Sequence, residues 1–337
     1  MITLQELLAG NKVKARNHNK TLVNHVWDRY WGCTDHVSEV ETVLVHRPGE
    51  EVLEFQNASY DERFDALFLK GENGEINSYI LGDTPPDLEL MQKQHDTLTT
   101  IYRQHGIDVI ELEDSPKLLT NRLFPRDVGM VIPGGVVLSR FALPMRYAEV
   151  RNAQKTFAKH EIPILGTIQG KGTMEGGSFI MIDPNTAAVG TSVRVNQEGV
   201  QQLRSILAMQ DIELIGVDLP SNLIHLDEVF MMVDHKTALA DYSKLPHWFI
   251  ETMKEKEIEL IPTDNRDPEL TTNCLPIAPG KVIFSTNGTY TMQRLKDHGI
   301  EVIEIDISEI NKMGGGIHCS TLVLKRKYSA WADMEEE

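Results

Sequence analysis

Cys319 is the residue of this chain whose surroundings best suit nucleophilic chemistry. It follows three glycines in the stretch MGGGIHCSTL. Because glycine has no Cβ, such a loop lets a thiol approach a ligand closely, whereas a lone cysteine is more often buried and inert. The other two cysteines, Cys33 and Cys274, stand beside no comparable loop, and we predict that they are structural. Cys319 is therefore the candidate nucleophile.

His225 and Asp227 stand two residues apart in IHLDEVF, where an apolar run begins. In a strand, alternate side chains share a face, so both would point to the same side. A histidine beside a carboxylate is a tuned acid or base, whereas an isolated H-x-D is more often a surface turn. Glu175 holds the same place in MEGGSF, before another strand signal, which favours the functional interpretation.

Two acids from separate segments suggest a ligand class. Asp127, in FPRDVG, would by itself be a local partner of the arginine beside it. A guanidinium, however, is planar, permanently charged and carries five N–H donors, and carboxylates bind it in matching geometry. Asp127 and Asp227 could each bind one edge and leave the carbon open to Cys319. A cationic substrate would also favour the thiolate form of that cysteine.

A repeated unit positions these residues. Five segments read as an amphipathic helix followed by a β-branched strand, at residues 87–112, 145–166, 197–217, 246–263 and 289–305. Between them lie paired strand signals with tight-turn residues, at 128–141, 176–192, 228–242 and 275–286. The period of roughly 45–50 residues indicates a radial array, and a helix in every unit counts against the all-strand propellers. We expect an α/β fold of ββαβ modules around a pseudo-symmetry axis.

No Pro/Ser-rich linker divides this array, so we predict one catalytic domain at residues 40–330. Residues 1–39 form a predicted N-terminal extension with helix signals, and residues 331–337 form an acidic tail that we expect to fray.

Composition excludes several function classes. The chain has 337 residues, of which 41% are hydrophobic and 25% are charged, as in a soluble globular protein. A formal charge of −17 argues against a nucleic-acid partner and is compatible with a small cationic substrate. No apolar run suits a membrane span or a signal peptide. Three cysteines fit neither a disulfide framework nor a zinc site, so we expect a cytoplasmic protein without metal or cofactor, with a homo-oligomer left open.

Five motifs in order resemble the guanidino-group-modifying superfamily, the penteins, and among them the arginine deiminase branch. The resemblance runs from about Val43 to Leu324. The motifs are N-x-L-F-x-R-D from Asn121, E-G-G at Glu175, H-L-D-x-V-F from His225, N-x-L-x-I-A-P-G from Asn273, and the glycine-rich loop ending in Cys319. The resemblance implies a five-bladed α/β propeller.

The resemblance also implies catalytic roles. Cys319 would form a covalent thiouronium intermediate, and His225 would protonate the leaving amine and then activate water. Asp127 and Asp227 would bind the guanidinium, and Glu175 would orient the histidine. Arginine and water would give citrulline and ammonia, with no metal.

The amino-acid end of the substrate would be held by Asn121, Arg146 and Arg194, which match binding positions of arginine deiminases. Each arginine lies at the same offset from the acid of its own module, Arg146 after Asp127 and Arg194 after Glu175. This regularity supports the assignment.

Some positions depart from the deiminase pattern. Family deiminases carry an arginine in the loop before the cysteine, where this chain has Met313 to His318, and Ser178 stands where aspartate is common. A helical subdomain of bacterial arginine deiminases is not expected. The loop is more similar to arginine dihydrolases and agmatine deiminases, but dihydrolases have asparagine at the position of Asp127, and aspartate favours stopping after one C–N cleavage.

Three rival functions use the same residues. An amidinotransferase would move the amidino group to an amine, although that branch usually reads H-x-D-T-x-F where this chain reads HLDEVF. A non-catalytic arginine sensor would not need the complete set of catalytic residue types. Hydrolysis of dimethylarginine would differ only in the substrate. Arginine, agmatine and methylated arginines stay open as substrates.

Overall fold

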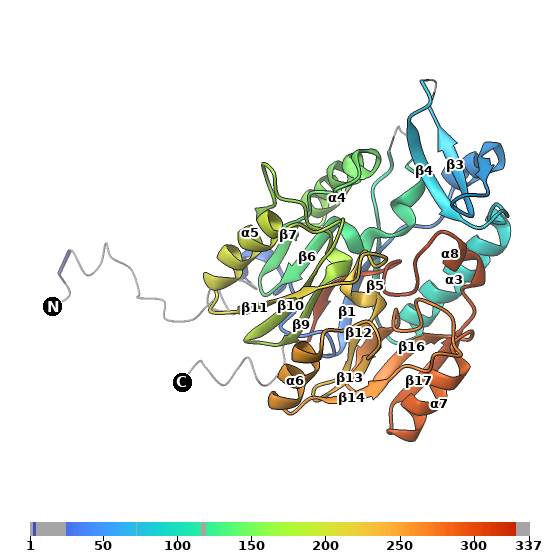
Figure 1. Ribbon diagram of the computed structural model, residues 1–337. Coiled ribbons are helices and arrows are strands. Elements are labelled where there is room, and N and C mark those ends of the chain that lie inside the picture. The colour runs from blue at the N-terminus through green and yellow to red at the C-terminus, as the bar shows by residue number, and fades with distance from the viewer. Residues whose placement is uncertain (1–2, 5–24, 72, 116–118, 328–337) are drawn as a thin grey trace.

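The computed structural model describes residues 3–4, 25–71, 73–115 and 119–327, and these form an α/β structure of three-stranded sheets (Figure 1). Four sheets repeat one order, in which an antiparallel hairpin is followed by a helix and a strand parallel to the second hairpin strand. The α/β class predicted from the sequence is confirmed, and all four predicted hairpins are present.

The first two repeats contain β6 (Gly129–Ile132), β7 (Gly135–Leu138), α4 (Tyr147–Lys159) and β8 (Ile164–Thr167), then β9 (Phe179–Asp183), β10 (Thr186–Thr191), α5 (Gln197–Ala208) and β11 (Glu213–Asp218). The next two contain β12 (Phe230–Asp234), β13 (Thr237–Ala240), α6 (His247–Glu255) and β14 (Glu259–Pro262), then β15 (Leu275–Ala278), β16 (Lys281–Ser285), α7 (Thr289–Asp297) and β17 (Glu301–Ile305).

A fifth sheet joins distant parts of the chain. Its strand β1 (Val40–Val45) pairs in parallel with β5 (Asp108–Glu111), which follows α3 (Leu88–Gln104). On its other side β1 pairs antiparallel with β18 (Leu322–Arg326), which follows the short helix α8 (Ser308–Lys312). This sheet thus repeats the same strand order with its first strand taken from the far end of the sequence, and it places Cys319 just before β18.

Five helix ends share one stop signal. A residue with positive φ follows each helix, and the N–H of the isoleucine after it donates to a carbonyl five residues back, as in a Schellman motif. The isoleucines are all buried. The residue pairs are Gly106–Ile107, Glu161–Ile162, Asp211–Ile212, Glu257–Ile258 and Gly299–Ile300. The repeat predicted from helix and strand periodicity therefore extends to the helix caps.

These caps predict stability changes of opposite sign. Glu161 has a φ of 55°, which is costly for a residue with a Cβ, so Glu161→Gly should raise the free energy of unfolding by about 0.5 kcal/mol. Gly299→Ala should lower it by about 1 kcal/mol, although a Cβ there meets no atom within 4 Å, because only the backbone conformation is strained. Urea unfolding of both variants measures the effect, and equal signs would contradict the assignment.

An additional sheet of three antiparallel strands, the insert sheet, interrupts the first module. It consists of β2 (Ser59–Asp61), β3 (Ala66–Lys70) and β4 (Ile76–Leu81), and the 3-10 helix η1 (Glu50–Asn57) precedes it. It projects from one end of the molecule in Figure 1. The sequence reading assigned no element to this region. Within the described residues, no helical subdomain separates the modules.

The first strands of the modules pack together in the interior. Strand β12 contacts β9 and β15, and β18 contacts β6. These strands are buried on both faces, except for residues at their ends. The loops that precede the first strands are consequently brought close together, and these loops carry the residues singled out for chemistry.

Part of the predicted N-terminal extension packs into this core. The indole of Trp31 is buried, and its carbonyl accepts the N–H of Gly134 at 3.0 Å, while the N–H of Gly32 donates to Leu324 at 3.0 Å. Residues 5–24 and the predicted acidic tail lie outside the described residues. Among the described helices, none has the length and apolar composition that a membrane crossing requires.

Candidate active site

Short 3-10 turns before the first strands contain Asp127 and Asp227, and Glu175 and His225 directly precede two of these turns. The turns are η3 (Pro125–Val128), η5 (Gly176–Ser178) and η6 (Leu226–Glu228), and η5 contacts both of the others. The predicted strand alternation of His225 and Asp227 was wrong, because β12 begins only at Phe230. The Glu228 carboxylate accepts the N–H groups of Ile224 and His225 at 2.8 and 2.7 Å, which closes a turn at this point.

The E-G-G motif is explained by close packing at this junction. A Cβ on Gly176 would lie 2.2 Å from the carbonyl oxygen of Arg126, and one on Gly177 would lie 2.7 Å from Nδ1 of His225. Neither contact is sterically possible. The N–H of Gly177 also donates to Oδ1 of Asp127 at 3.1 Å. The two glycines therefore let the turns approach closely enough for their polar side chains to meet.

His225 lies between two carboxylates. Its Nε2 donates to Oε2 of Glu175 at 2.9 Å, and its Nδ1 lies 3.6 Å from Oδ1 of Asp127. All three side chains are buried. Burial alone would lower the pKa of His225, but Asp127 and Glu175 outweigh it and raise the pKa to about 9. Burial opposes ionisation of Asp127, yet His225 and Arg146 lower its pKa to about 2. The imidazole is therefore protonated at neutral pH and can serve as an acid.

This cluster predicts a pH-dependent stability. Because the folded-state pKa of His225, about 9, exceeds its ordinary value of 6.5, protonation stabilises the fold fully below about pH 6.5, and this contribution disappears as the pH rises through 9. The difference in unfolding free energy between wild type and His225→Gln should shrink by more than about 1 kcal/mol between pH 6.5 and pH 10. Urea unfolding at several pH values measures it. A constant or growing difference would show that His225 is neutral in the folded protein.

The two predicted arginines pair with the acids of their own modules. Arg146 Nη1 donates to Oδ2 of Asp127 at 2.7 Å, and Arg194 Nη1 lies 3.5 Å from Oε2 of Glu175, both over a separation of 19 residues. Arg146 also donates from Nε and Nη2 to Glu149, at 3.0 and 2.8 Å. Burial would lower the pKa of Arg146, but Glu149 and Asp127 raise it well above the ordinary value. Two carboxylates thus already balance its charge.

Cys319 is held by Asn273 from the neighbouring module. The Asn273 amide donates to Sγ at 3.1 Å, and its carbonyl oxygen accepts the N–H of Cys319 at 3.1 Å. A Cβ on Gly316 would lie 2.6 Å from that oxygen, which explains one glycine of the loop. Burial, Asp227 and Asp127 raise the pKa of the Cys319 thiol well above its ordinary value. The sulfur therefore needs a neighbouring cation to become a thiolate.

Asp227 has one occupied and one free carboxylate oxygen. Its Oδ2 accepts Nδ1 of His318 at 2.6 Å and lies 3.8 Å from Sγ of Cys319. Burial and Arg126 lower the pKa of His318 to about 4, so a neutral imidazole makes this bond. Oδ1 of Asp227 is buried and has no hydrogen-bond partner among the described residues. A buried carboxylate oxygen without a hydrogen bond lowers the stability of the folded protein. We therefore expect a ligand to donate an N–H to this atom.

All eight predicted site residues lie in the loops that precede the first strands of the modules or close to these loops. The structure brings Asp127, Glu175, His225, Arg146 and Arg194 into one connected group, and it places Cys319 against Asp227. Asn121 lies in the 3-10 helix η2 (Thr120–Leu123), where its Oδ1 accepts the hydroxyl of Ser78 at 3.1 Å. Their roles stay predictions.

Sequence reasoning assigned no role to four further residues of the site: Tyr79, Glu149, Asn273 and His318. Asn273 and His318 stand inside motifs that were recognised, so their chemistry could have been read from those motifs. Glu149 is three residues after Arg146 on a helix, a spacing typical of ion pairs. Tyr79, whose hydroxyl accepts Nη2 of Arg194 at 3.2 Å, lies on the insert sheet and gave no signal.

A metal would compete with existing charges. Within the described residues, the Asp127, Glu175 and His225 group has potential ligand atoms within 4.8 Å of one another. Both carboxylates already face an arginine, and the imidazole is protonated between them. A protonated imidazole has no free lone pair, so this arrangement disfavours a metal ion coordinated by all three groups.

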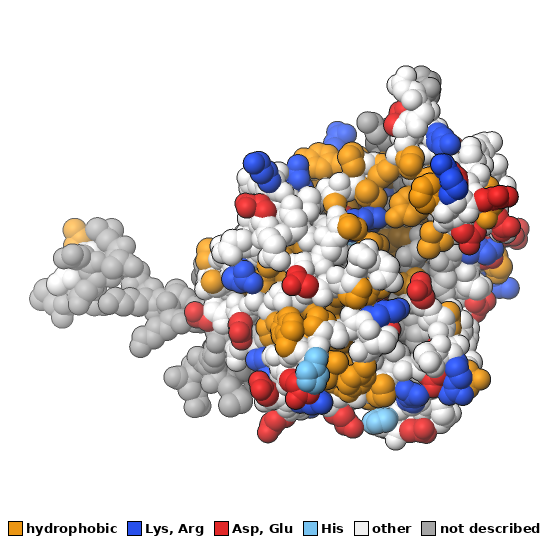
Figure 2. Space-filling model, viewed as in Figure 1, with side chains coloured by type: hydrophobic (Ala, Val, Ile, Leu, Met, Phe, Trp, Pro, Cys, Tyr) orange, Lys and Arg blue, Asp and Glu red, His pale blue; other side chains and the backbone are white. Residues whose placement is uncertain are grey.

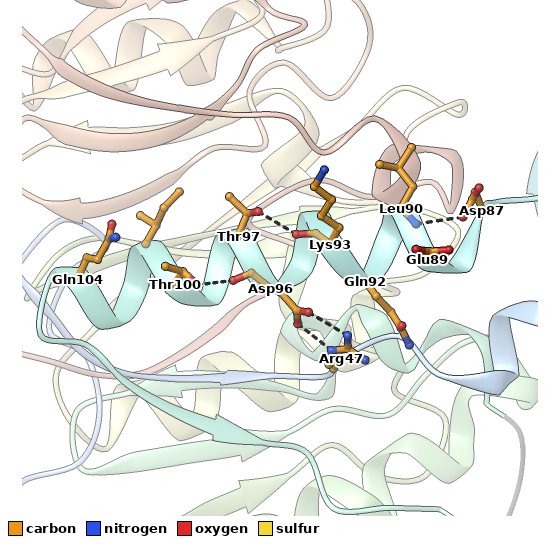
Figure 3. A pocket seen from close by; sticks show the side chains of 11 residues that line it. Arg47, Asp87, Glu89, Leu90, Gln92, Lys93, Asp96, Thr97, Thr100 and Gln104 are labelled. Carbon is orange, nitrogen blue, oxygen red and sulfur yellow. Dashed lines mark hydrogen bonds and ion pairs between the residues drawn. The ribbon is translucent and has the colours of Figure 1, made fainter.

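Two surface hollows differ in their relation to these residues. A groove of about 790 Å³ runs along α3, and its lining includes the ion pair Arg47–Asp96 at 2.7 Å (Figure 3). A smaller cavity of about 270 Å³ is lined by Asn121, Arg146 and Glu149, and it therefore adjoins the acid cluster. On the face shown in Figure 2, basic side chains are interspersed with acidic ones, so the net negative charge does not form a uniform field there.

Solved structures share this fold. DDAH from Pseudomonas aeruginosa, as a mutant complexed with citrulline, superposes with a TM-score of 0.67 at 20% identity, covering 84% of this chain and 99% of that one. The N-terminal domain of ArgZ, a cyanobacterial arginine dihydrolase, gives 0.69 at 18% identity, covering 86% and 98%. The inosamine-phosphate amidinotransferase of Streptomyces griseus gives 0.65 at 13%, covering 88% and 97%.

Sequence comparisons identify the family. The uncharacterised protein YkgA of Bacillus subtilis (strain 168) is 32% identical over 234 residues, covering 69% of this chain and 79% of YkgA. Arginine deiminase of Bacillus thuringiensis subsp. konkukian is 23% identical, covering 87% of this chain and 98% of that enzyme. Residues 87–326 match the model of the family described as N,N dimethylarginine dimethylhydrolase, eukaryotic. The chain therefore belongs to the dimethylarginine dimethylhydrolase family, within the pentein superfamily of enzymes that modify guanidino groups.

Proposed function

We propose that this protein hydrolyses a guanidinium C–N bond of arginine or a close derivative and releases citrulline, with arginine deiminase-type chemistry as the first candidate. The free Oδ1 of Asp227 carries the proposal, because it is a buried anionic acceptor beside the nucleophilic sulfur and the described residues offer it no donor. A guanidinium supplies both the missing N–H and the positive charge.

Binding of the cation would activate the nucleophile. A guanidinium between Asp227 and Asp127 would neutralise the two carboxylates that raise the pKa of the Cys319 thiol. The thiol would then lose its proton in the complex and not in the free enzyme. This order confines the reactive thiolate to the substrate-bound state.

The chemistry would proceed in two steps. The Cys319 thiolate adds to the guanidinium carbon, and the imidazolium of His225 protonates the leaving nitrogen, so that ammonia departs and an S-linked thiouronium remains. Neutral His225 then takes a proton from water as it attacks the same carbon. Collapse of this adduct breaks the C–S bond and releases citrulline, and the cysteine and histidine return to their starting states. Glu175 acts as a positioning residue for the imidazole.

A second candidate differs only in the leaving group. The family model favours dimethylarginine as substrate, in which case dimethylamine would leave and citrulline would still be the product. The proposal includes a catalytic domain at residues 40–330, a cytoplasmic site of action and a five-bladed α/β propeller of ββαβ modules. Five sheets of one strand order and the contacts among their first strands support that arrangement.

A panel of guanidino compounds tests the proposal. Arginine, agmatine, asymmetric dimethylarginine and guanidinoacetate are incubated with the protein, and citrulline, ammonia, dimethylamine and urea-type products are measured. Citrulline with ammonia from arginine supports the deiminase candidate, and citrulline with dimethylamine supports the second. Turnover that requires an added amine acceptor identifies an amidinotransferase, and no turnover under any of these conditions contradicts the proposal.

A further inference from the structure

Asp227 differs from the other candidate catalytic acids in the charges that surround it. Asp127 and Glu175 each face an arginine, and the protonated His225 lies between them. Within the described residues, Asp227 forms no ion pair with a lysine or an arginine, and the side-chain nitrogen that bonds to it is Nδ1 of His318 at 2.6 Å. The negative charge of Asp227 is therefore left for a cationic ligand.

The hydrogen bond from His318 fixes the orientation of this carboxylate. Since an ionised carboxylate only accepts, Nδ1 of His318 carries the proton and donates it to Oδ2. Both side chains are buried, and the opposite oxygen, Oδ1, is the atom without a partner among the described residues. Oδ2 also lies 3.8 Å from Sγ of Cys319. His318 thus shares the oxygen that would otherwise accept the thiol proton alone.

The surroundings of His318 keep its imidazole neutral. Burial and then Arg126 lower the pKa of His318 to about 4, and they outweigh the opposing effect of Asp227. Arg326 acts in the same direction as Arg126. The ring of His36, from the predicted N-terminal extension, lies 5.6 Å from that of His318, and its Nδ1 accepts a backbone N–H of β9 at 3.0 Å. An imidazolium at this position would balance Asp227 before a substrate arrived, whereas a neutral imidazole does not.

We propose that His318 is a positioning residue for Asp227, a neutral N–H donor that holds Oδ1 toward the guanidinium and leaves the carboxylate its charge for that cation. The inference rests on the proposed function and deepens it, because such a carboxylate favours a cationic guanidino group over the neutral ureido group of citrulline. A lysine or an arginine in place of His318 would supply an N–H but would also neutralise the acid.

Two substitutions that differ in one hydrogen bond test this role. His318→Leu removes the N–H donor and should lower kcat for the preferred guanidino substrate roughly tenfold or more, with a smaller change in KM. The reason is that Asp227 still attracts the cation but no longer holds it against the sulfur. The amide nitrogen introduced by His318→Asn can take the place of Nδ1, so this variant should stay within about threefold of wild type.

Alkylation of Cys319 by iodoacetamide across a pH series gives a readout that a merely structural role would not move. Without His318, Oδ2 of Asp227 would accept the thiol proton alone, so the midpoint of the rate against pH should rise in His318→Leu. It should stay at the wild-type value in His318→Asn. A change in access to the sulfur would alter the maximum rate and not this midpoint.

His95→Leu is the matched control for both measurements. His95 is also buried, and burial lowers its pKa to about 4, but neither ring nitrogen has a hydrogen-bond partner among the described residues. Its substitution should leave kcat, KM and the alkylation midpoint unchanged. If His318→Leu does not fold, His318→Met, which also lacks an N–H donor, takes its place.

The outcomes separate this inference from the proposed function. Equal losses of kcat in His318→Leu and His318→Asn, or full activity in His318→Leu, would overturn the inference and leave guanidino hydrolysis standing. If the wild type turns over no guanidino compound, the proposed function fails, and the alkylation midpoints then decide the inference. A higher midpoint in His318→Leu than in His318→Asn and His95→Leu supports it, and equal midpoints overturn it.

Discussion

Cys319→Ser should lower turnover of the preferred guanidino substrate by at least about 10³-fold while binding of that substrate persists. A serine hydroxyl in this position keeps the hydrogen bond to Asn273, but its pKa is far too high for a bound cation to ionise it. Product formation measures the loss, and calorimetry measures the retained binding.

Cys274→Ser is the matched control for this prediction. Cys274 is also buried, and burial raises the pKa of its thiol to about 12, but Cys274 belongs to a buried hydrophobic cluster. Its substitution should cost stability and leave activity within a few-fold of wild type. Substantial turnover by a folded Cys319→Ser variant would contradict the assignment of the nucleophile.

Asp227→Asn should have two effects of opposite sign on the same cysteine. Substrate turnover should fall by about 10²-fold or more, because the guanidinium loses its anionic acceptor at Oδ1. The Cys319 thiol should nevertheless become more acidic, because Asp227 is one of the charges that raise its pKa. Alkylation of the free enzyme by iodoacetamide across a pH series should therefore be faster in the variant.

Asn273→Ala provides the comparison for the alkylation measurement. The Asn273 amide donates to the sulfur and lowers the pKa of the thiol, so its removal should slow alkylation at a given pH. If both variants shift alkylation in the same direction, the contacts do not control the thiol as described. If Asp227→Asn keeps full turnover, the carboxylate is not the guanidinium acceptor.

Local patterns in the sequence accounted for most of the fold. Helix periodicity and turn residues located the four hairpins and the helices, because each repeat encodes its own start and stop, down to the left-handed residue before each isoleucine. The pairing of β1 with β18 has no local signature, since the two strands are far apart in the chain. The insert sheet breaks the period, and no turn or repeat signal distinguished it.

The sequence indicated the residue types of the candidate site and the spacing between them, but not how their side chains are arranged in space. Arg146 and Arg194 stand at a constant spacing from Asp127 and Glu175. In the structure, each arginine forms an ion pair with the acid of its module. The sequence analysis missed the 3-10 turn before β12. The Glu228 carboxylate accepts two backbone N–H groups there, so the chain forms a turn where strand alternation had been expected. The free oxygen of Asp227 depends on packing from three segments, which no spacing rule records.

The sheet that joins β1 to β18 delays assembly of the site during synthesis. Until the ribosome has translated Leu322–Arg326, β1 lacks its antiparallel neighbour and the sulfur of Cys319 has no fixed position. Pairings over such long separations form late, because the intervening chain must first be ordered. A polypeptide truncated before β18 would therefore lack the complete site that the proposed reaction requires.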